Sequence, residues 1–254
     1  MLKIRVIPTL LYKDFGLVKG IKFDSSRRVG SVLPAIKVYN QREVDELIFL
    51  DIGALNKKTD IDLEMIKDIS QDCFVPFTVG GGIDSCKKVE DLLMSGADKI
   101  SINSSAYLNP GILTEISNRF GSQCLTVSID VRNISPNQWE CYSHSGRNST
   151  GKNVVAWAKE IEDRGAGEIL LTSIDYDGTM LGYDLPLIES VVQSVNIPVI
   201  ASGGAGSYKD MISAINCSGA SAISAASIFH FTEQTPLGAK HSLSSAGIPV
   251  RLPI

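Results

Sequence analysis

Four aspartates follow apolar, strand-like stretches of the sequence, at positions where an enzyme built on a parallel sheet could use them. Asp51 and Asp130 each end such a stretch, and Asp175 and Asp177 follow a third one. Asp130 closes the apolar segment Ser-Ile-Asp, so we expect it in a partly desolvated site, where the pKa of a carboxyl group rises toward the range useful for proton transfer. We interpret Asp175 as a helix cap or an ion-pair partner.

Two glycine-rich loops, at 80–82 and 202–205, also end strand-like stretches. Each is followed, at the end of the next stretch, by a pair with a small hydroxyl residue: Asn103-Ser104 and Ala226-Ser227. Backbone amides from two neighbouring loops form an anion site that needs no lysine. Either loop alone could serve only to make a tight turn, but the duplication favours a ligand with two phosphate groups.

The duplication extends over a longer repeat. VPFTVGGGIDSCKKVEDLLMSGADKISINSSA aligns with IPVIASGGAGSYKDMISAINCSGASAISAASI, and three matched pairs are each 123 residues apart: Gly81 with Gly204, Gly96 with Gly219, and Ser104 with Ser227. The two halves of the chain are therefore predicted to be copies of one half-barrel, which would present similar loops twice around one mouth.

The elements that position these residues alternate between strands and helices. We expect strands at 4–8, 46–52, 75–81, 98–103, 124–130, 168–173, 197–202 and 221–225. We expect amphipathic helices at 62–69, 85–94, 110–120, 154–163, 185–195 and 208–217. Strands that are apolar on both faces and alternate with helices indicate a parallel sheet covered by helices. Eight such units predict one (βα)₈ barrel domain over residues 1–254, with a polar excursion at 133–153 after the fifth strand.

Composition excludes several classes of protein. The net charge of −4 argues against nucleic acid as the main partner. The five cysteines are odd in number, scattered and without metal-binding spacing, so we expect reduced thiols, a cytoplasmic protein, and neither a metal site nor a cofactor. The sequence shows no signal-peptide pattern and no apolar run long enough to cross a membrane.

Several stretches resemble one known family. They include KDFGLVKG, DELIFLDI, FTVGGGI, GADKISINSSA, RFGSQCLTVSID, GAGEILLTSIDYDGT, IPVIASGGAG and ASIFHF, and they reach GIPVRL near the end of the sequence. Over essentially its whole length the chain is similar to HisF, the cyclase subunit of imidazole glycerol phosphate synthase. This resemblance implies a barrel that accepts ammonia from a HisH-like glutaminase and adds it to a bisphosphorylated aminoimidazole-carboxamide ribonucleotide.

The resemblance also implies roles for individual residues. Asp130 corresponds to a catalytic acid or base, Lys19 to a residue that folds over the substrate, and Asp177 to a further member of the catalytic set. Substrate contacts correspond to Asp51, Asn103, Thr172 and Ser202. The two phosphate cradles correspond to Gly82, Asn103 and Ser104, and to Gly178, Gly204, Ala226 and Ser227.

The opposite end of the barrel matches the family as well. The charged ring at the family's ammonia entrance corresponds to Arg5, Glu46, Lys99 and Glu168, and the residue that touches the glutaminase corresponds to Asp98. A ring of opposite charges could serve stability alone. Charges at strand starts in an apolar core are nevertheless expensive unless they are paired or useful.

One catalytic position departs from the family. The family's first strand ends in Cys-Leu-Asp-Val, whereas this chain has Thr-Leu-Leu-Tyr, so Leu11 replaces the second catalytic carboxylate. Loss of such a group typically lowers the rate by roughly 10²- to 10⁴-fold. In the neighbouring loop at 25–32, Arg28 and Ser31 each stand where the family has an acidic residue.

Three functions therefore stay open. The first is an ammonia-channelling subunit that supplies nucleotide-sugar amidation for lipopolysaccharide or O-antigen, as in a divergent branch of the family. The second is true imidazole glycerol phosphate synthase in histidine biosynthesis, with Asp14 or Asp177 as a substitute acid. The third is a non-catalytic protein that activates a glutaminase.

Overall fold

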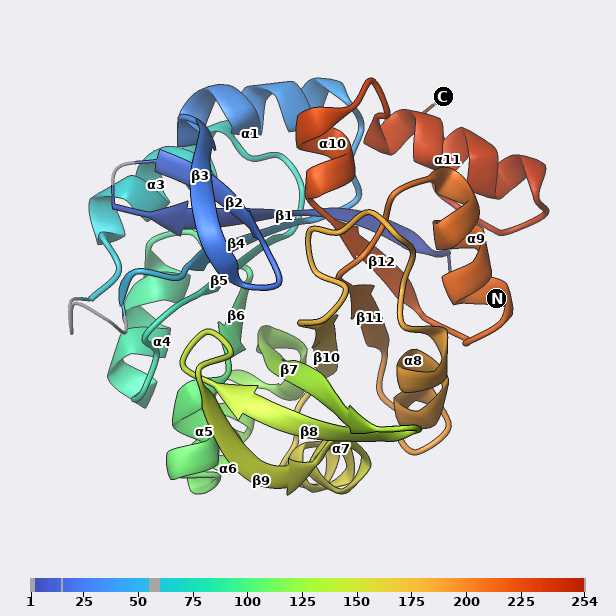
Figure 1. The fold of residues 1–254 in the computed structure, drawn as a ribbon. Helices are drawn as coiled ribbons and strands as arrows, with labels where there is room; N and C mark the ends of the chain where they lie inside the picture. Colours follow the sequence, from blue (N-terminus) through green and yellow to red (C-terminus); the bar gives the residue numbers. More distant parts are fainter. Residues whose placement is uncertain (1–2, 15, 55–59, 254) are drawn as a thin grey trace.

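Eight parallel strands close into a barrel in the computed structural model, which describes residues 3–14, 16–54 and 60–253. Each strand pairs with the next in chain order, and the last pairs with the first, so the ring has no open edge. Figure 1 shows this ring with helices packed around its outside. The barrel strands are β1 (Arg5–Lys13), β4 (Leu47–Asp51), β5 (Phe77–Gly80), β6 (Lys99–Ile102), β7 (Leu125–Ser135), β10 (Glu168–Ser173), β11 (Val199–Ser202) and β12 (Ala222–Ala225).

The six predicted helices are all present, with ends that shift by a few residues. Their starts carry ordinary caps: the side chain of Asp62 accepts the N–H groups of Glu64 and Met65, and Asn153 caps the helix that follows the excursion. Pro110 stands at the N-cap position and not inside its helix. The helices are α1 (Val32–Gln41), α3 (Leu63–Asp72), α4 (Cys86–Met94), α5 (Ser104–Leu108), α6 (Gly111–Phe120), α7 (Val154–Asp163), α8 (Leu185–Val192), α9 (Tyr208–Asn216), α10 (Ser227–Phe231) and α11 (Pro236–Ser245), with a 3-10 turn, η1, at Ser122–Cys124.

Each half of the barrel carries an antiparallel hairpin after its first strand. β2 (Gly16–Ile21) and β3 (Asp24–Gly30) follow β1, and β8 (Gln138–Ser143) and β9 (Asn148–Asn153) follow β7. The predicted first strand, 4–8, is too short because the end of β1 also pairs with β2. The polar excursion was predicted correctly in place, but its strand structure was not predicted. In Figure 1 the two hairpins stand on opposite sides of the ring.

The core has two parts that follow the alternation of strand residues. Side chains on the outside of the strands, such as Val6 and Leu10 of β1, pack against the helices. Side chains on the inside form a separate apolar layer within the barrel: Ile7, Ile48, Leu170, Ile200 and Ala222. This filled layer separates the two ends of the barrel, as expected for a packed interior and not an open pore.

All five cysteines are free thiols. Among the residues that the structure describes, none of the helices is long and apolar enough to cross a membrane.

Candidate active site

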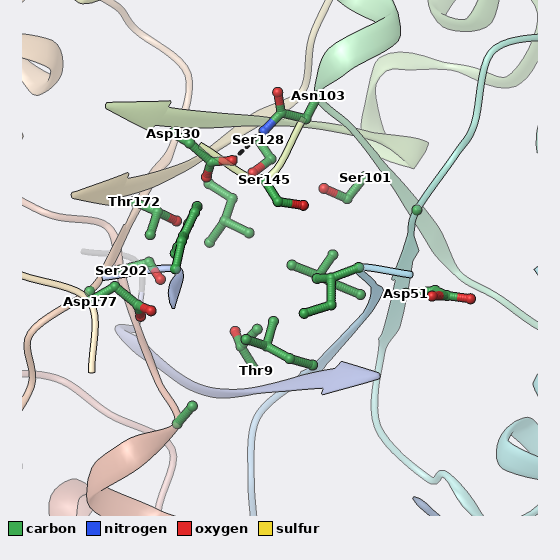
Figure 2. A pocket seen from close by; sticks show the side chains of 18 of the residues that line it. Thr9, Asp51, Ser101, Asn103, Ser128, Asp130, Ser145, Thr172, Asp177 and Ser202 are labelled. Carbon is green, nitrogen blue, oxygen red and sulfur yellow. Dashed lines mark hydrogen bonds between the residues drawn. The ribbon is translucent and has the colours of Figure 1, made fainter. Parts of the chain in front are cut away.

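A cavity of about 610 Å³ lies at the carboxyl ends of the barrel strands. Every residue that the sequence assigns to catalysis, substrate binding or phosphate binding lines it. They are Lys19, Asp51, Gly82, Asn103, Ser104, Asp130, Thr172, Asp177, Gly178, Ser202, Gly204, Ala226 and Ser227. Figure 2 labels six of them around the cavity: Asp51, Asn103, Asp130, Thr172, Asp177 and Ser202. The carboxyl ends of parallel strands meet at one face of the barrel, which brings together residues far apart in the chain.

Asp130 is buried at the end of β7 and has the environment predicted for a proton-transfer group. Burial raises the pKa of its carboxyl to about 7, and the negative charge of Asp177 adds to this rise, whereas a hydrogen bond from Asn103 opposes it. That bond joins Asn103 Nδ2 to Asp130 Oδ2 over 2.7 Å. A carboxyl group with a pKa near neutrality can both accept and donate a proton under physiological conditions.

Lys19 and Asp177 form a buried ion pair at the rim of the cavity. The ammonium group of Lys19 donates to both carboxylate oxygens of Asp177, over 2.7 Å and 2.8 Å. Lys19 lies on β2, so this bond holds the β2–β3 hairpin against the loop after β10. A backbone bond of 2.8 Å from Lys22 N to the carbonyl of Asp177 strengthens the same contact. The hairpin is thus folded across part of the mouth.

Leu11 occupies the place in the first half-barrel that Asp130 occupies in the second. Leu11 of β1 is in register with Leu50 of β4, and Asp130 of β7 is in register with Thr172 of β10. The next strand pairings, β4 with β5 and β10 with β11, continue the same correspondence. Both side chains line the cavity. One side of the mouth therefore presents an apolar side chain where its symmetry mate presents a carboxylate.

Small hydroxyl residues surround the floor of the cavity, and sequence reasoning missed four of them. Thr9, Ser101, Ser128 and Ser224 are buried and line the cavity, and Thr9 Oγ1 lies 2.5 Å from Ser224 Oγ. Figure 2 shows the first three around the same central space as Thr172 and Ser202. Each of the four stands inside an apolar strand, two residues before a position that lines the mouth, and only that spacing could have pointed to them.

Two of the predicted aspartates have local structural duties. One carboxylate oxygen of Asp51 accepts the N–H groups of Gly53 and Ala54, over 2.8 Å and 3.1 Å. In Figure 2 this side chain points away from Asp130. Asp175 accepts the N–H of Asn133 over 2.9 Å and lies 4.0 Å from the guanidinium of Arg132, which agrees with its predicted role as an ion-pair partner.

The two predicted phosphate cradles lie where the sequence places them. Gly82 and Gly204 both have positive φ, 59° and 108°, which glycine adopts readily. Within the described residues, the backbone N–H groups of Gly82, Gly204 and Ser227 have no hydrogen-bond acceptor. The hydroxyl of Ser227 is also buried without a partner. Such groups are normally satisfied in proteins, so they are available to an anion in the cavity.

The constant spacing of 123 residues between the repeats is wrong for the glycine loops. The strand registers match Gly81 with Gly203, because Gly80 and Ser202 occupy equivalent places. The spacing reaches 123 only further on, because the connection after α9, at 217–221, is one residue longer than that after α4, at 95–98. Gly82 and Gly204, the predicted cradle residues, are therefore true counterparts.

Gly204 is constrained by its own backbone as well as by any ligand. A Cβ atom added there would overlap the carbonyl oxygen of Gly182. We therefore expect Gly204→Val to shift the backbone. A loss of ligand affinity in that variant would not show that the valine side chain blocks the cradle.

The charged residues predicted at the opposite end of the barrel form a connected network. The guanidinium of Arg5 contacts Glu46 over 2.7 Å and also contacts Glu168. The ammonium of Lys99 contacts the same two carboxylates, over 2.9 Å and 3.2 Å. Thr78 Oγ1 donates a further bond of 3.0 Å to Glu46. Each acid thus bridges both bases, so the four strand starts share one ring of paired charge.

Asp98, the predicted contact with a glutaminase, is exposed at the same end of the barrel. Its carboxylate accepts the N–H of Phe77 over 2.8 Å, and its own N–H donates to the carbonyl of Phe77 over 2.9 Å. The side chain therefore also joins β6 to β5. This role was not predicted, and it bears on how a substitution at Asp98 should be read.

The two loop residues that replace family acids lie outside the cavity lining. Arg28 is exposed on β3, next to Gly16 on the neighbouring strand. Ser31 stands at the N-cap of α1 without a side-chain capping bond. In the part of the chain that the structure describes, no three His, Cys, Asp or Glu side chains are grouped to hold a metal ion.

The model of a family described as histidine biosynthesis protein matches residues 5–235, which cover the whole barrel from β1 to the end of α10. The match covers most of the chain and agrees with the resemblance found in the sequence motifs.

Proposed function

The chain belongs to the family of histidine biosynthesis proteins, which are isomerases and cyclases, and from this premise we propose that it is an ammonia-using barrel of the HisF kind. It would work with a HisH-like glutaminase docked at the amino ends of the strands. It would bind a bisphosphorylated or nucleotide-type substrate in the mouth at the carboxyl ends.

The observation that carries this proposal is the charged ring at the amino end of the barrel. Glu46 is almost fully buried, with 1% of its surface exposed, and Glu168 is 7% exposed. Burying ionised groups costs several kcal/mol each before pairing offsets it, and apolar residues of similar volume would often be at least as stable. A polar ring on the barrel axis is useful for admitting a small polar molecule such as ammonia. A sugar isomerase has no need of one.

The mouth supports chemistry on an acceptor different from the family's. Asp130 has the raised pKa of a proton-transfer group, but its counterpart Leu11 can neither take nor give a proton. Cyclisation to an imidazole needs two such groups. We therefore propose that the ammonia serves amidation of a nucleotide sugar for lipopolysaccharide or O-antigen.

A specific observation favours one alternative, imidazole glycerol phosphate synthase activity itself. Asp177 lines the cavity and interacts electrostatically with Asp130, so it could replace the missing acid. Asp14, the other proposed substitute, is exposed and does not line the cavity. A purely non-catalytic activator of a glutaminase is less well supported, because it would not need a buried acid with a raised pKa in an enclosed mouth.

The proposal is tested by mixing the purified chain with a HisH-like glutaminase from the same organism. Size-exclusion chromatography should show a one-to-one complex, and glutamine hydrolysis by the partner should increase on mixing. Absence of a complex at micromolar concentration overturns the partnership. The neighbouring genes then separate the two acceptors: polysaccharide genes favour nucleotide-sugar amidation, and a histidine operon favours the cyclase.

A further inference from the structure

The two halves of the barrel place a hairpin beside each phosphate cradle. The first cradle lies on the loops after β5 and β6, and the next strand, β7, carries the β8–β9 hairpin. The second cradle lies on the loops after β11 and β12, and the next strand in the ring, β1, carries the β2–β3 hairpin. By symmetry alone, each hairpin should cover its cradle in the same way.

The β8–β9 turn does cover the first cradle. The backbone N–H of His144 donates a hydrogen bond of 2.9 Å to the hydroxyl of Ser104, a cradle residue. Gly146, two residues further along the turn, packs so closely against Phe23 and Ile174 that an added Cβ atom would lie 3.0 Å from each side chain. The turn is therefore held over the cradle from both sides.

The β2–β3 hairpin meets the second cradle at Gly178 and not at the hydroxyl of Ser227. Its backbone bonds to the loop after β10, where Lys22 N donates to the carbonyl of Asp177. Among the described residues, Ser227, the counterpart of Ser104, has no partner for its buried hydroxyl. The second cradle therefore offers backbone amides and this hydroxyl to a ligand.

The arginines of the two hairpins also differ, because only one of them lines the mouth cavity. Arg147, in the β8–β9 turn, lines the mouth cavity beside Ser104 and Ser145. Arg27, on β3, does not line it; its guanidinium lies 3.9 Å from the centre of the Phe231 ring.

Few cations reach the cavity from the described residues. Those that line it are Lys13, Lys19 and Arg147. Lys19 is engaged with Asp177 near the second half of the mouth. Lys13 lies beside the loop that carries Gly53. Arg147 is the cation whose own turn is bonded to a cradle residue, and a guanidinium is well suited to bidentate contact with phosphate.

We propose that the β8–β9 turn caps the first cradle and that Arg147 binds the phosphate group held there. The second cradle then binds its phosphate through backbone amides and Ser227, without a dedicated arginine. This inference rests on the proposed function, because it assumes that the cradles bind phosphate groups. With Arg147 in place, the first cradle would discriminate between a substrate whose end group is a phosphate dianion and one whose end group is neutral.

The test is a titration of the full-length chain with inorganic phosphate at pH 8, followed by ¹⁵N NMR. The amide signals of Ser104 and Ser227 report on the two cradles separately. We expect Arg147→Ala to weaken phosphate binding at the first cradle by about tenfold, as loss of a charge-assisted contact does, and to leave the second cradle unchanged. Arg147→Lys should retain part of the affinity, because it keeps the charge but loses the fork geometry.

Arg27→Ala is the matched control, since it removes an arginine from the symmetry-related hairpin, and it should change neither affinity. Unaltered binding at the first cradle in Arg147→Ala, or equal weakening at both cradles, overturns the inference and leaves the proposed function standing. If the unaltered chain binds phosphate at neither cradle, the inference and the predicted phosphate sites are overturned together. The glutaminase assay needs no phosphate, so it judges the partnership independently.

Discussion

Leu11 and Asp130 occupy equivalent positions in the two half-barrels, so the mouth presents an apolar side chain where its symmetry counterpart presents a proton-transfer group. Restoring a carboxylate at position 11 should therefore raise kcat more than it changes the affinity for the substrate. With ammonium salt as the nitrogen source, we expect Leu11→Asp to raise kcat for imidazole glycerol phosphate formation by about tenfold or more, against the 10²- to 10⁴-fold that such groups typically contribute. KM for the bisphosphorylated substrate should change little.

Leu11→Asn is the control for that substitution, since it adds a polar group of the same size that cannot exchange a proton. It should leave kcat unchanged. If the unaltered chain already turns over this substrate at roughly 1 s⁻¹ or faster, another residue such as Asp177 compensates for Leu11, and the cyclase function replaces the one proposed.

The stability of the fold should depend on the titration of Asp130. Its folded-state pKa is raised from 3.8 to about 7, so folding favours the protonated, neutral carboxyl. The stability that the protonated carboxyl contributes to the fold is fully present below the pKa of the unfolded chain and is lost as the pH rises through about 7. A rise of this size corresponds to about 4 kcal/mol at most. Asp130→Asn, which mimics the neutral form, should therefore be more stable than the natural chain at pH 8.

The measurement is the difference in free energy of unfolding between the two proteins, from urea denaturation at pH 5 and at pH 8. The advantage of Asp130→Asn should shrink as the pH falls. A difference that does not vary with pH would mean that Asp130 is ionised throughout this range in the folded protein.

The charged ring should be sensitive to the removal of a single member. Glu46→Gln leaves Arg5 and Lys99 to share the remaining carboxylate, Glu168. Breaking a buried network in this way typically costs about 3–5 kcal/mol, because a charge loses its compensation. Thermal and urea unfolding measure the change. Glu64→Gln removes a carboxylate from an exposed pair with Lys67 and should leave the unfolding midpoint unchanged.

Asp98 has two roles that two substitutions can separate. Asp98→Asn keeps an oxygen that can accept the N–H of Phe77 but removes the charge that a glutaminase would contact. Asp98→Ala removes both. We expect both variants to weaken activation of the partner's glutamine hydrolysis. Only Asp98→Ala should also lower the free energy of unfolding, by about 1 kcal/mol. Full activation by Asp98→Asn would contradict the proposed interface role.

The sequence alone predicted that the chain forms a barrel and which residues lie at its mouth. Eight apolar runs alternating with helices allow few other folds, and the ends of parallel strands converge on one face. The pattern places Asp130 and the glycine loops at the mouth, and the family resemblance places the charged ring at the opposite end; the structure has them at those ends. The same strand alternation contained Ser101 and Ser128, but an isolated serine in a strand carries no signal by itself.

Only the tertiary structure decided how those residues are used. The pairing of Lys19 with Asp177 joins strand β2 to the loop after β10, which come together only in the folded chain. The hydrogen bond from His144 to Ser104, and its absence at Ser227, depend on where each hairpin packs. Sequence symmetry predicts two equal cradles. The folded chain makes them unequal, because each hairpin takes the contacts that its own neighbouring loops provide.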